Sequence, residues 1–190
     1  MWRGFLKTLV LIGCVSLASV FASAQEVVHA LSGTVSNVNL SAKTITVNTD
    51  DGSEGTFKAM TDPKTRVEFD KTLRADATDA EAFKTKGTRV IVYYFGYSEV
   101  RTAVALRDLG PGPFTKSSGT IIKVEKGERT FTIKDPTGTV DSFKMTRSTV
   151  ADTGSGAVDG LKFEPEKGDQ VQVISTGVNG NATALFVNAM

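Results

Sequence analysis

The sequence is poor in the residues that most enzymes and metal-binding proteins use. Its 190 residues include one cysteine, one histidine and one tryptophan. Cys14 has no partner for an intramolecular disulfide, and His29 has no second histidine or nearby cysteine with which to hold a metal ion. We therefore predict no metal site and no cofactor, and we interpret His29 as a solvated residue just ahead of the first strand.

The sequence also lacks an arrangement for nucleophilic catalysis. It contains no G-x-S-x-G motif that would expose a serine on a strand-to-helix turn. A lone histidine in a lead-in segment has no serine to activate and no carboxylate to orient it. We predict that the protein is not an enzyme. The enzymatic alternative requires His29 to lie beside a carboxylate in a cleft.

The sequence has no marked excess of either positive or negative charge. The chain has 22 basic and 21 acidic side chains, for a formal net charge of +1. Such a balance provides no electrostatic surface for nucleic acid or anionic lipid. Beyond residue 24 no apolar run approaches the roughly 20 residues that a membrane-spanning helix needs. We expect no nucleic-acid partner and no membrane span.

The N-terminus has the three parts of a secretory signal peptide. Arg3 and Lys7 precede an apolar or small-residue run over 8–24, which ends in the small-residue motif Ala22-Ser23-Ala24. We predict a signal peptide over 1–24, cleavage near Ala24, and a periplasmic or extracellular protein. The alternative is a lipoprotein anchored through Cys14, because Leu11-Ile12-Gly13-Cys14 resembles a bacterial lipidation motif.

A long stretch of the sequence occurs twice. A shift of 86 positions places Ser32-Gly33-Thr34-Val35 on Ser118-Gly119-Thr120-Ile121, and the match continues without a gap to Phe57-Lys58 and Phe143-Lys144. Further on, Lys86-Gly87 recurs as Lys167-Gly168, so the second copy has lost five residues in between. We infer an internal duplication.

The duplication predicts two domains. Gly110-Pro111-Gly112-Pro113 cannot continue a strand ladder and lies between the repeats. We therefore assign 25–109 to a first copy, 110–117 to a linker and 118–190 to a second copy, and these names are kept below.

Alternating and β-branched residues predict five strands in each copy. The first-copy strands are expected over 31–40, 44–49, 54–60, 89–97 and 99–109, and the second-copy strands over 118–125, 130–134, 140–145, 170–176 and 182–188. Thr78-Asp79-Ala80-Glu81 fits a capping box, which predicts a short helix running into Phe83, between strands three and four of the first copy.

These elements predict an all-β fold of two tandem, small, five-stranded, OB-like antiparallel barrels. A single sandwich of all ten strands and an SH3-like barrel for each copy are the alternatives. The pattern G-T-V-x-x-V, K-T-I-T-V, a turn glycine, F-K and K-G-x-x-V-x-V resembles a family of secreted bacterial domains of unknown function. That resemblance implies an OB-like fold, often in tandem behind a signal peptide, and no catalytic residues.

One apolar stripe is a candidate binding or inter-domain surface. Alternation places Ile91, Tyr93 and Phe95 on the face of their strand opposite its valines, with Tyr97 just beyond. The stripe either packs against the other copy or forms a stacking platform for a ligand. Burial of Tyr93 and Phe95 by the second copy would exclude the ligand interpretation.

The sequence predicts a secreted, non-enzymatic binding or scaffolding protein of the bacterial envelope. Its expected partner is another envelope protein or a glycan. The alternative is a purely structural or stress-related envelope protein with no small ligand. Exposed aromatic side chains would favour binding, and buried ones would favour the structural alternative.

Overall fold

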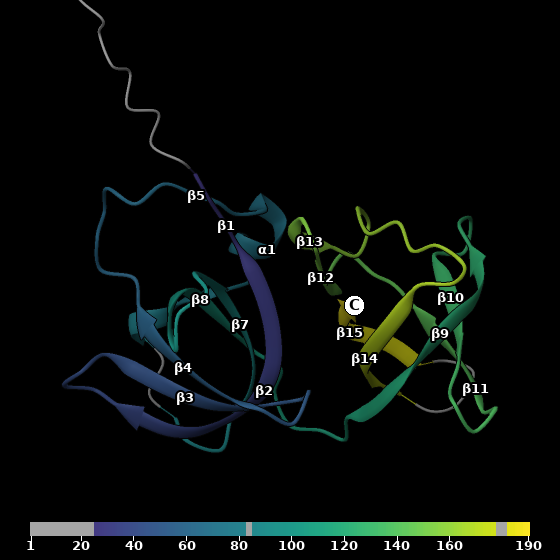
Figure 1. Cartoon of the computed structure of the whole chain (residues 1–190), viewed down its shortest axis with the longest axis horizontal. Coiled ribbons are helices and arrows are strands. Elements are labelled where there is room, and N and C mark those ends of the chain that lie inside the picture. Colours follow the sequence, from purple (N-terminus) through teal and green to yellow (C-terminus); the bar gives the residue numbers. More distant parts are fainter. Residues whose placement is uncertain (1–24, 83–84, 178–181) are drawn as a thin grey trace, which may run out of the picture.

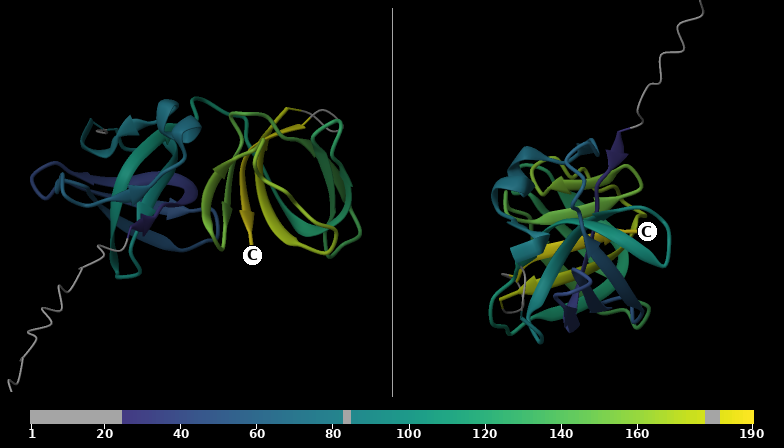
Figure 2. Two further views of the ribbon diagram at one scale, coloured as in Figure 1. Left: turned by 90° about the horizontal axis from the view of Figure 1, so that it is seen from above. Right: turned by 90° about the vertical axis from the view of Figure 1, so that its left-hand side faces the viewer.

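The computed structural model describes residues 25–82, 85–177 and 182–190, and it consists almost entirely of β-strands. Two ring-like sheets, one from each copy, lie side by side (Figure 1; Figure 2). The all-β prediction is confirmed. The predicted signal peptide and Cys14 lie outside the described residues. The described helices, α1 (Lys71–Ala75) and η1 (Ala80–Ala82), are too short to be membrane spans.

The first copy forms a ring-like sheet. Its strands are β1 (Glu26–Val27), β2 (His29–Asn39), β3 (Thr44–Thr49), β4 (Glu54–Ala59), β5 (Val67–Glu68), β6 (Thr78–Asp79), β7 (Arg89–Phe95) and β8 (Val100–Asp108). The long strands follow the order β4-β3-β2-β7-β8, and β4 pairs again with β8. The sheet curves into a ring that does not close as a barrel.

The second copy repeats this order and closes as a five-stranded mixed barrel. Its strands are β9 (Thr115–Glu125), β10 (Thr130–Lys134), β11 (Val140–Lys144), β12 (Val150–Thr153), β13 (Gly156–Asp159), β14 (Gln170–Thr176) and β15 (Ala182–Ala189). The barrel order is β11-β10-β9-β14-β15, with β11 returning to β15. The hairpin β12–β13 extends from β15 and was not predicted.

The structure corrects the predicted barrels in two respects. The ten long strands begin and end within three residues of their predicted ends. However, the pairs β4–β8 and β11–β15 are parallel, so neither ring is wholly antiparallel. Five strands cannot alternate in direction all the way round a ring, because an odd number leaves one pair running the same way. In addition, the five-strand barrel is present only in the second copy.

The short helix of the first copy lies between strands three and four, but its position differs from the prediction. Asp70 caps α1 instead of Thr78, and its carboxylate accepts the N–H groups of Thr72 at 2.8 Å and Leu73 at 3.1 Å. Leu73 is completely buried. The capping aspartate and the burial of Leu73 together account for a helix at this place. The segment at Thr78 forms β6 and η1, and Phe83 lies outside the described residues.

The repeated glycines mark a close approach of two backbones. A Cβ atom at Gly33 would lie 2.4 Å from the carbonyl oxygen of Asn48, and one at Gly119 would lie 2.4 Å from that of Lys134. Asn48 and Lys134 are themselves related by the same shift of 86 positions. The S-G-T motif therefore recurs because the first strand of each copy crosses the second too closely for a side chain.

Three hydrophobic clusters hold the molecule together. One fills the first ring around Val47 and Phe57, and another fills the second barrel around Ile121 and Phe131. The third takes side chains from both copies, and we call it the shared core. Its members are Val28, Ala30, Leu73, Ile91, Tyr93, Val104 and Ala105 from the first copy, and Val150, Ala157, Ile174 and Phe186 from the second.

Candidate functional site

The apolar stripe predicted on β7 lies mostly inside the molecule. Ile91 and Tyr93 are both 0% exposed and belong to the shared core. Phe95 is partly buried against the same cluster, whereas Tyr97 is 95% exposed. A stacking platform requires accessible rings. Ile91 and Tyr93 therefore offer no surface to a ligand.

The two copies meet through equivalent positions of their fourth and fifth strands. In the first copy Tyr93 pairs across the sheet with Ala105, and in the second copy Ile174 pairs with Phe186. The two pairs are related by the shift of 81 positions that relates Lys86 to Lys167. All four side chains are buried in the shared core. The outer faces of these strands are thus covered by the other copy.

The hairpin β12–β13 extends this contact to the start of the first copy. The Ala157 N–H donates to the carbonyl oxygen of Val28 at 2.8 Å, and the Ala30 N–H donates to Oδ1 of Asp152 at 2.9 Å. Gly156 has a φ of 109°, and a Cβ there would lie 2.6 Å from the side chain of Val27. These two hydrogen bonds and the close approach therefore dock the hairpin onto the segment from Val27 to Ala30.

His29 is not the solvated residue that we predicted. It begins β2, its side chain is 19% exposed, and its Nδ1 lies 3.3 Å from Oδ1 of Asp152. Burial raises the pKa of Asp152, against the opposing effects of the Ala30 N–H and of His29. The prediction was wrong because the carboxylate comes from a hairpin 123 residues further along the chain.

The His29–Asp152 pair belongs to the docking of the copies. Within the described ranges, the ring of His29 makes no hydrogen bond besides the one to Asp152. A catalytic histidine of the serine-hydrolase type needs a hydroxyl group on its other side. The part of the chain that the structure describes also contains no group of three or more histidine, cysteine, aspartate or glutamate side chains suited to a metal ion.

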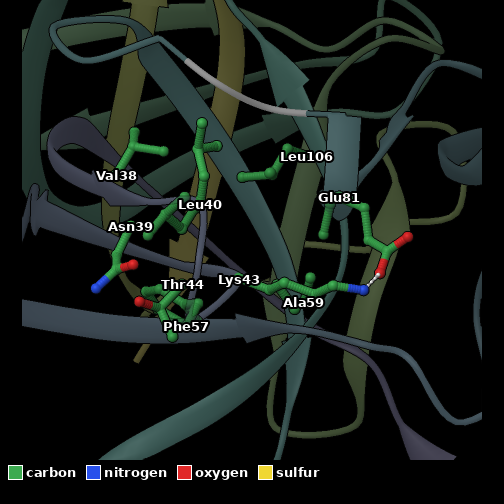
Figure 3. Close-up of a pocket in the computed structure, with 12 residues that line it drawn as sticks. Val38, Asn39, Leu40, Lys43, Thr44, Phe57, Ala59, Glu81 and Leu106 are labelled. Carbon is green, nitrogen blue, oxygen red and sulfur yellow. Dashed lines mark hydrogen bonds and ion pairs between the residues drawn. The ribbon is translucent and has the colours of Figure 1, made fainter.

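The first copy contains an apolar hollow at one end of its ring (Figure 3). Its volume is about 290 Å³, close to the lower limit of about 300 Å³ that is common for small-molecule sites. The lining comes from β2, β3, β4, β8, η1 and the β2–β3 connection. The lining residues are Val38, Asn39, Leu40, Lys43, Thr44, Ile45, Phe57, Ala59, Ala80, Glu81, Ala103 and Leu106.

An ion pair spans the rim of this hollow. Lys43 Nζ lies 2.7 Å from Oε1 of Glu81, and both side chains are about half exposed, at 52% and 51%. Figure 3 shows the Lys43 side chain running past Ala59 toward Glu81. Leu40 stands at the same rim and is 63% exposed. The hollow thus combines apolar walls with one cation and one anion at its edge.

Lys43 has a positive φ angle, which is unfavourable for residues other than glycine. It ends the connection between β2 and β3 with a φ of 54°, and Arg129 has the same φ at the equivalent place in the second copy. Left-handed backbone costs a residue with a Cβ atom about 1–2 kcal/mol, whereas glycine adopts it freely. The copies therefore keep a basic side chain where glycine would be unstrained.

The equivalent hollow of the second copy is smaller. It is lined by Val124, Lys126, Arg129 and Met145, the counterparts of Val38, Leu40, Lys43 and Ala59, together with 160–161 and 163–165, and its volume is about 170 Å³. Met145 and Phe163 are 5% and 8% exposed. A methionine thus occupies the space that Ala59 leaves open in the first copy.

Sequence reasoning missed the first-copy hollow. Its space depends on small side chains, Ala59, Ala80 and Ala103, in three segments that come together only in the folded ring. One signal was nevertheless available, because the duplication aligns Ala59 with Met145. A large apolar residue replaced by alanine at an inward-facing position indicates a difference in filling between the copies.

No protein-family model matches the sequence, and the search of curated proteins gives no significant match.

Proposed function

We propose that this protein is a secreted, non-enzymatic binding protein of the bacterial envelope that holds a small, largely apolar ligand in the first-copy hollow. The predicted signal peptide supports the location. An OB-like assignment is supported by the five-strand order shared by both copies and by the position of the hollow. OB-folds bind ligands partly through the loop between their first two strands, and that loop here runs from Leu40 to Lys43.

One observation carries this proposal: the hollow is larger in the first copy, at about 290 Å³, than in the second, at about 170 Å³. Both copies keep the same strand order and the same hydrogen bond below the rim, from Ala59 N–H to Lys43 O at 2.9 Å and from Met145 N–H to Arg129 O at 2.8 Å. An unfilled apolar space costs stability relative to a packed one. Its greater size in one of two copies with the same strand order supports a ligand that fills it.

A purely structural function is the second candidate, and the shared core favours it. Ile91 and Tyr93 of the first copy are buried in a cluster shared with side chains of the second copy. A shared core of this kind would make the two copies a rigid spacer. On this alternative, the first-copy hollow binds nothing.

Methyl NMR spectra of isotope-labelled protein titrated with 1-octanol distinguish the two candidates. We expect saturable shifts of the methyl groups of Val38, Ile45 and Leu106, which line the hollow. Ala59→Met introduces the side chain of the second copy, which narrows the hollow, and should weaken octanol binding so that the shifts saturate only at higher octanol concentration. Lys58→Met is the matched control, because it adds the same side chain one residue earlier on the exposed face of β4.

Overpacking by Ala59→Met can destabilise the fold by about 1–3 kcal/mol. Leu40→Asn is therefore a second variant, since it changes a rim residue that is already 63% exposed. It should weaken octanol binding and leave the fold intact. Saturable binding that neither variant alters, or the absence of shifts at the lining methyl groups, would overturn the proposal.

A further inference from the structure

We infer that the ligand of the first-copy hollow is an aliphatic carboxylate whose anionic group binds Lys43 Nζ in place of the Glu81 carboxylate. This inference rests on the proposed function, because it names the chemical class of the ligand for the same site. Three observations support it: the strained basic residue at the rim, the weak ion pair that it makes, and its counterpart in the second copy.

The first observation is the cost of placing a basic side chain at this position. Lys43 and Arg129 both have a φ of 54°, in the region where glycine is favoured. Two residues of the same charge in the same disfavoured conformation indicate that the cation, and not the turn alone, is being kept. Backbone strain of this kind is concentrated at ligand-binding sites.

The second observation is that Lys43 can exchange its partner easily. Its ion pair with Glu81 is about half exposed on both sides, so water screens it and its net stabilisation is small. The Lys43 stem lines the hollow while Nζ reaches the rim, as Figure 3 shows. A chain in the hollow therefore brings its carboxylate to the place where the Glu81 carboxylate now lies.

The third observation comes from the second copy. Arg129 lines the smaller hollow, and in the described part of the chain no carboxylate lies within ion-pair distance of it. The second copy thus has a basic residue at this position although, among the described residues, it forms no ion pair there. A basic residue at this position in both copies is consistent with an anion as the group that this rim position recognises.

The volume suits a chain of moderate length. An engineered apolar cavity of about 150 Å³ binds benzene, so a hollow of about 290 Å³ accommodates a larger group. Octanoate is therefore a suitable probe, and 1-octanol is its matched neutral control, with the same number of carbon atoms and no charge.

The test compares dissociation constants for octanoate and 1-octanol at low salt, using the methyl shifts of Val38, Ile45 and Leu106. We expect octanoate to bind about 1.5- to fivefold more tightly in the natural protein, the range of a partly exposed charge pair. Lys43→Met should remove this preference. Lys58→Met, which deletes a nearby exposed positive charge outside the hollow, should leave it unchanged.

The outcomes separate this inference from the proposed function. Equal affinity for the two probes, or a preference that survives Lys43→Met, overturns the carboxylate assignment while the hollow remains a binding site. Failure of both probes to shift the lining methyl groups overturns the proposed function itself. Glu81→Gln provides an independent check: it removes the competing carboxylate and should strengthen octanoate binding without strengthening octanol binding.

Discussion

Ile174 provides the sharpest test of the docking between the copies. It belongs to the second copy but lies outside the barrel interior, and it is 0% exposed in the shared core. Ile174→Ala deletes three carbon groups, which at about 0.8 kcal/mol each amounts to about 2.4 kcal/mol of lost burial. The cavity adds to this, because β9 and β15 hold β14 on both sides and prevent its collapse. We expect the free energy of unfolding to fall by about 3–4 kcal/mol, within the usual range for such changes.

Urea denaturation followed by circular dichroism measures this loss, since the only tryptophan, Trp2, lies in the predicted signal peptide. Tyr93→Phe is the matched control in the same cluster. The Tyr93 hydroxyl is buried without a hydrogen-bond partner among the described residues, so its removal should cost less than about 1 kcal/mol. If the copies did not dock, Ile174 would be a surface residue, and its truncation would change stability by less than about 0.5 kcal/mol. That result would refute the shared core.

Two further changes test the rim and the interface. Lys43→Gly should raise the free energy of unfolding by up to about 1 kcal/mol, because strain relief exceeds the added freedom of unfolded glycine; a lower urea midpoint would contradict this. Asp152 has a pKa raised by burial above its ordinary 3.8, so its protonation favours the folded state. Stability of the natural protein relative to Asp152→Asn should therefore increase as pH falls from the raised pKa toward 3.8. Denaturation at pH 7 and pH 4 measures the difference, and a pH-independent difference would contradict it.

The strands and their repetition could be predicted from the sequence because their signals are local. Period-two alternation over Thr44–Thr49 and the turn glycine Gly52 depend only on neighbouring residues. The parallel closure of each ring could also have been expected, since five strands cannot alternate throughout. The helix was misplaced because the prediction rested on the capping box at Thr78, whereas Asp70 caps the helix that forms and Leu73 within that helix is buried.

The site was harder to predict because its parts come from distant segments. His29 was assigned to solvent because its partner, Asp152, lies on a hairpin of small residues that gave little strand signal. The turn of the hairpin contains Gly154-Ser155-Gly156, a composition that is typical of loops. The first-copy hollow exists because the side chain of Ala59 is small, and a small side chain at one position does not form a sequence motif.

The hairpin β12–β13 also makes the contact between the two copies asymmetric. In solenoid proteins every unit presents the same face to the next, so the array lengthens one unit at a time. Among the described residues, only the second copy carries such a docking hairpin, and it contacts Val28 and Ala30 at the start of the first copy. The second copy, as far as it is described, has no counterpart of β1 or α1. The two described units therefore play different parts in their contact and are not interchangeable.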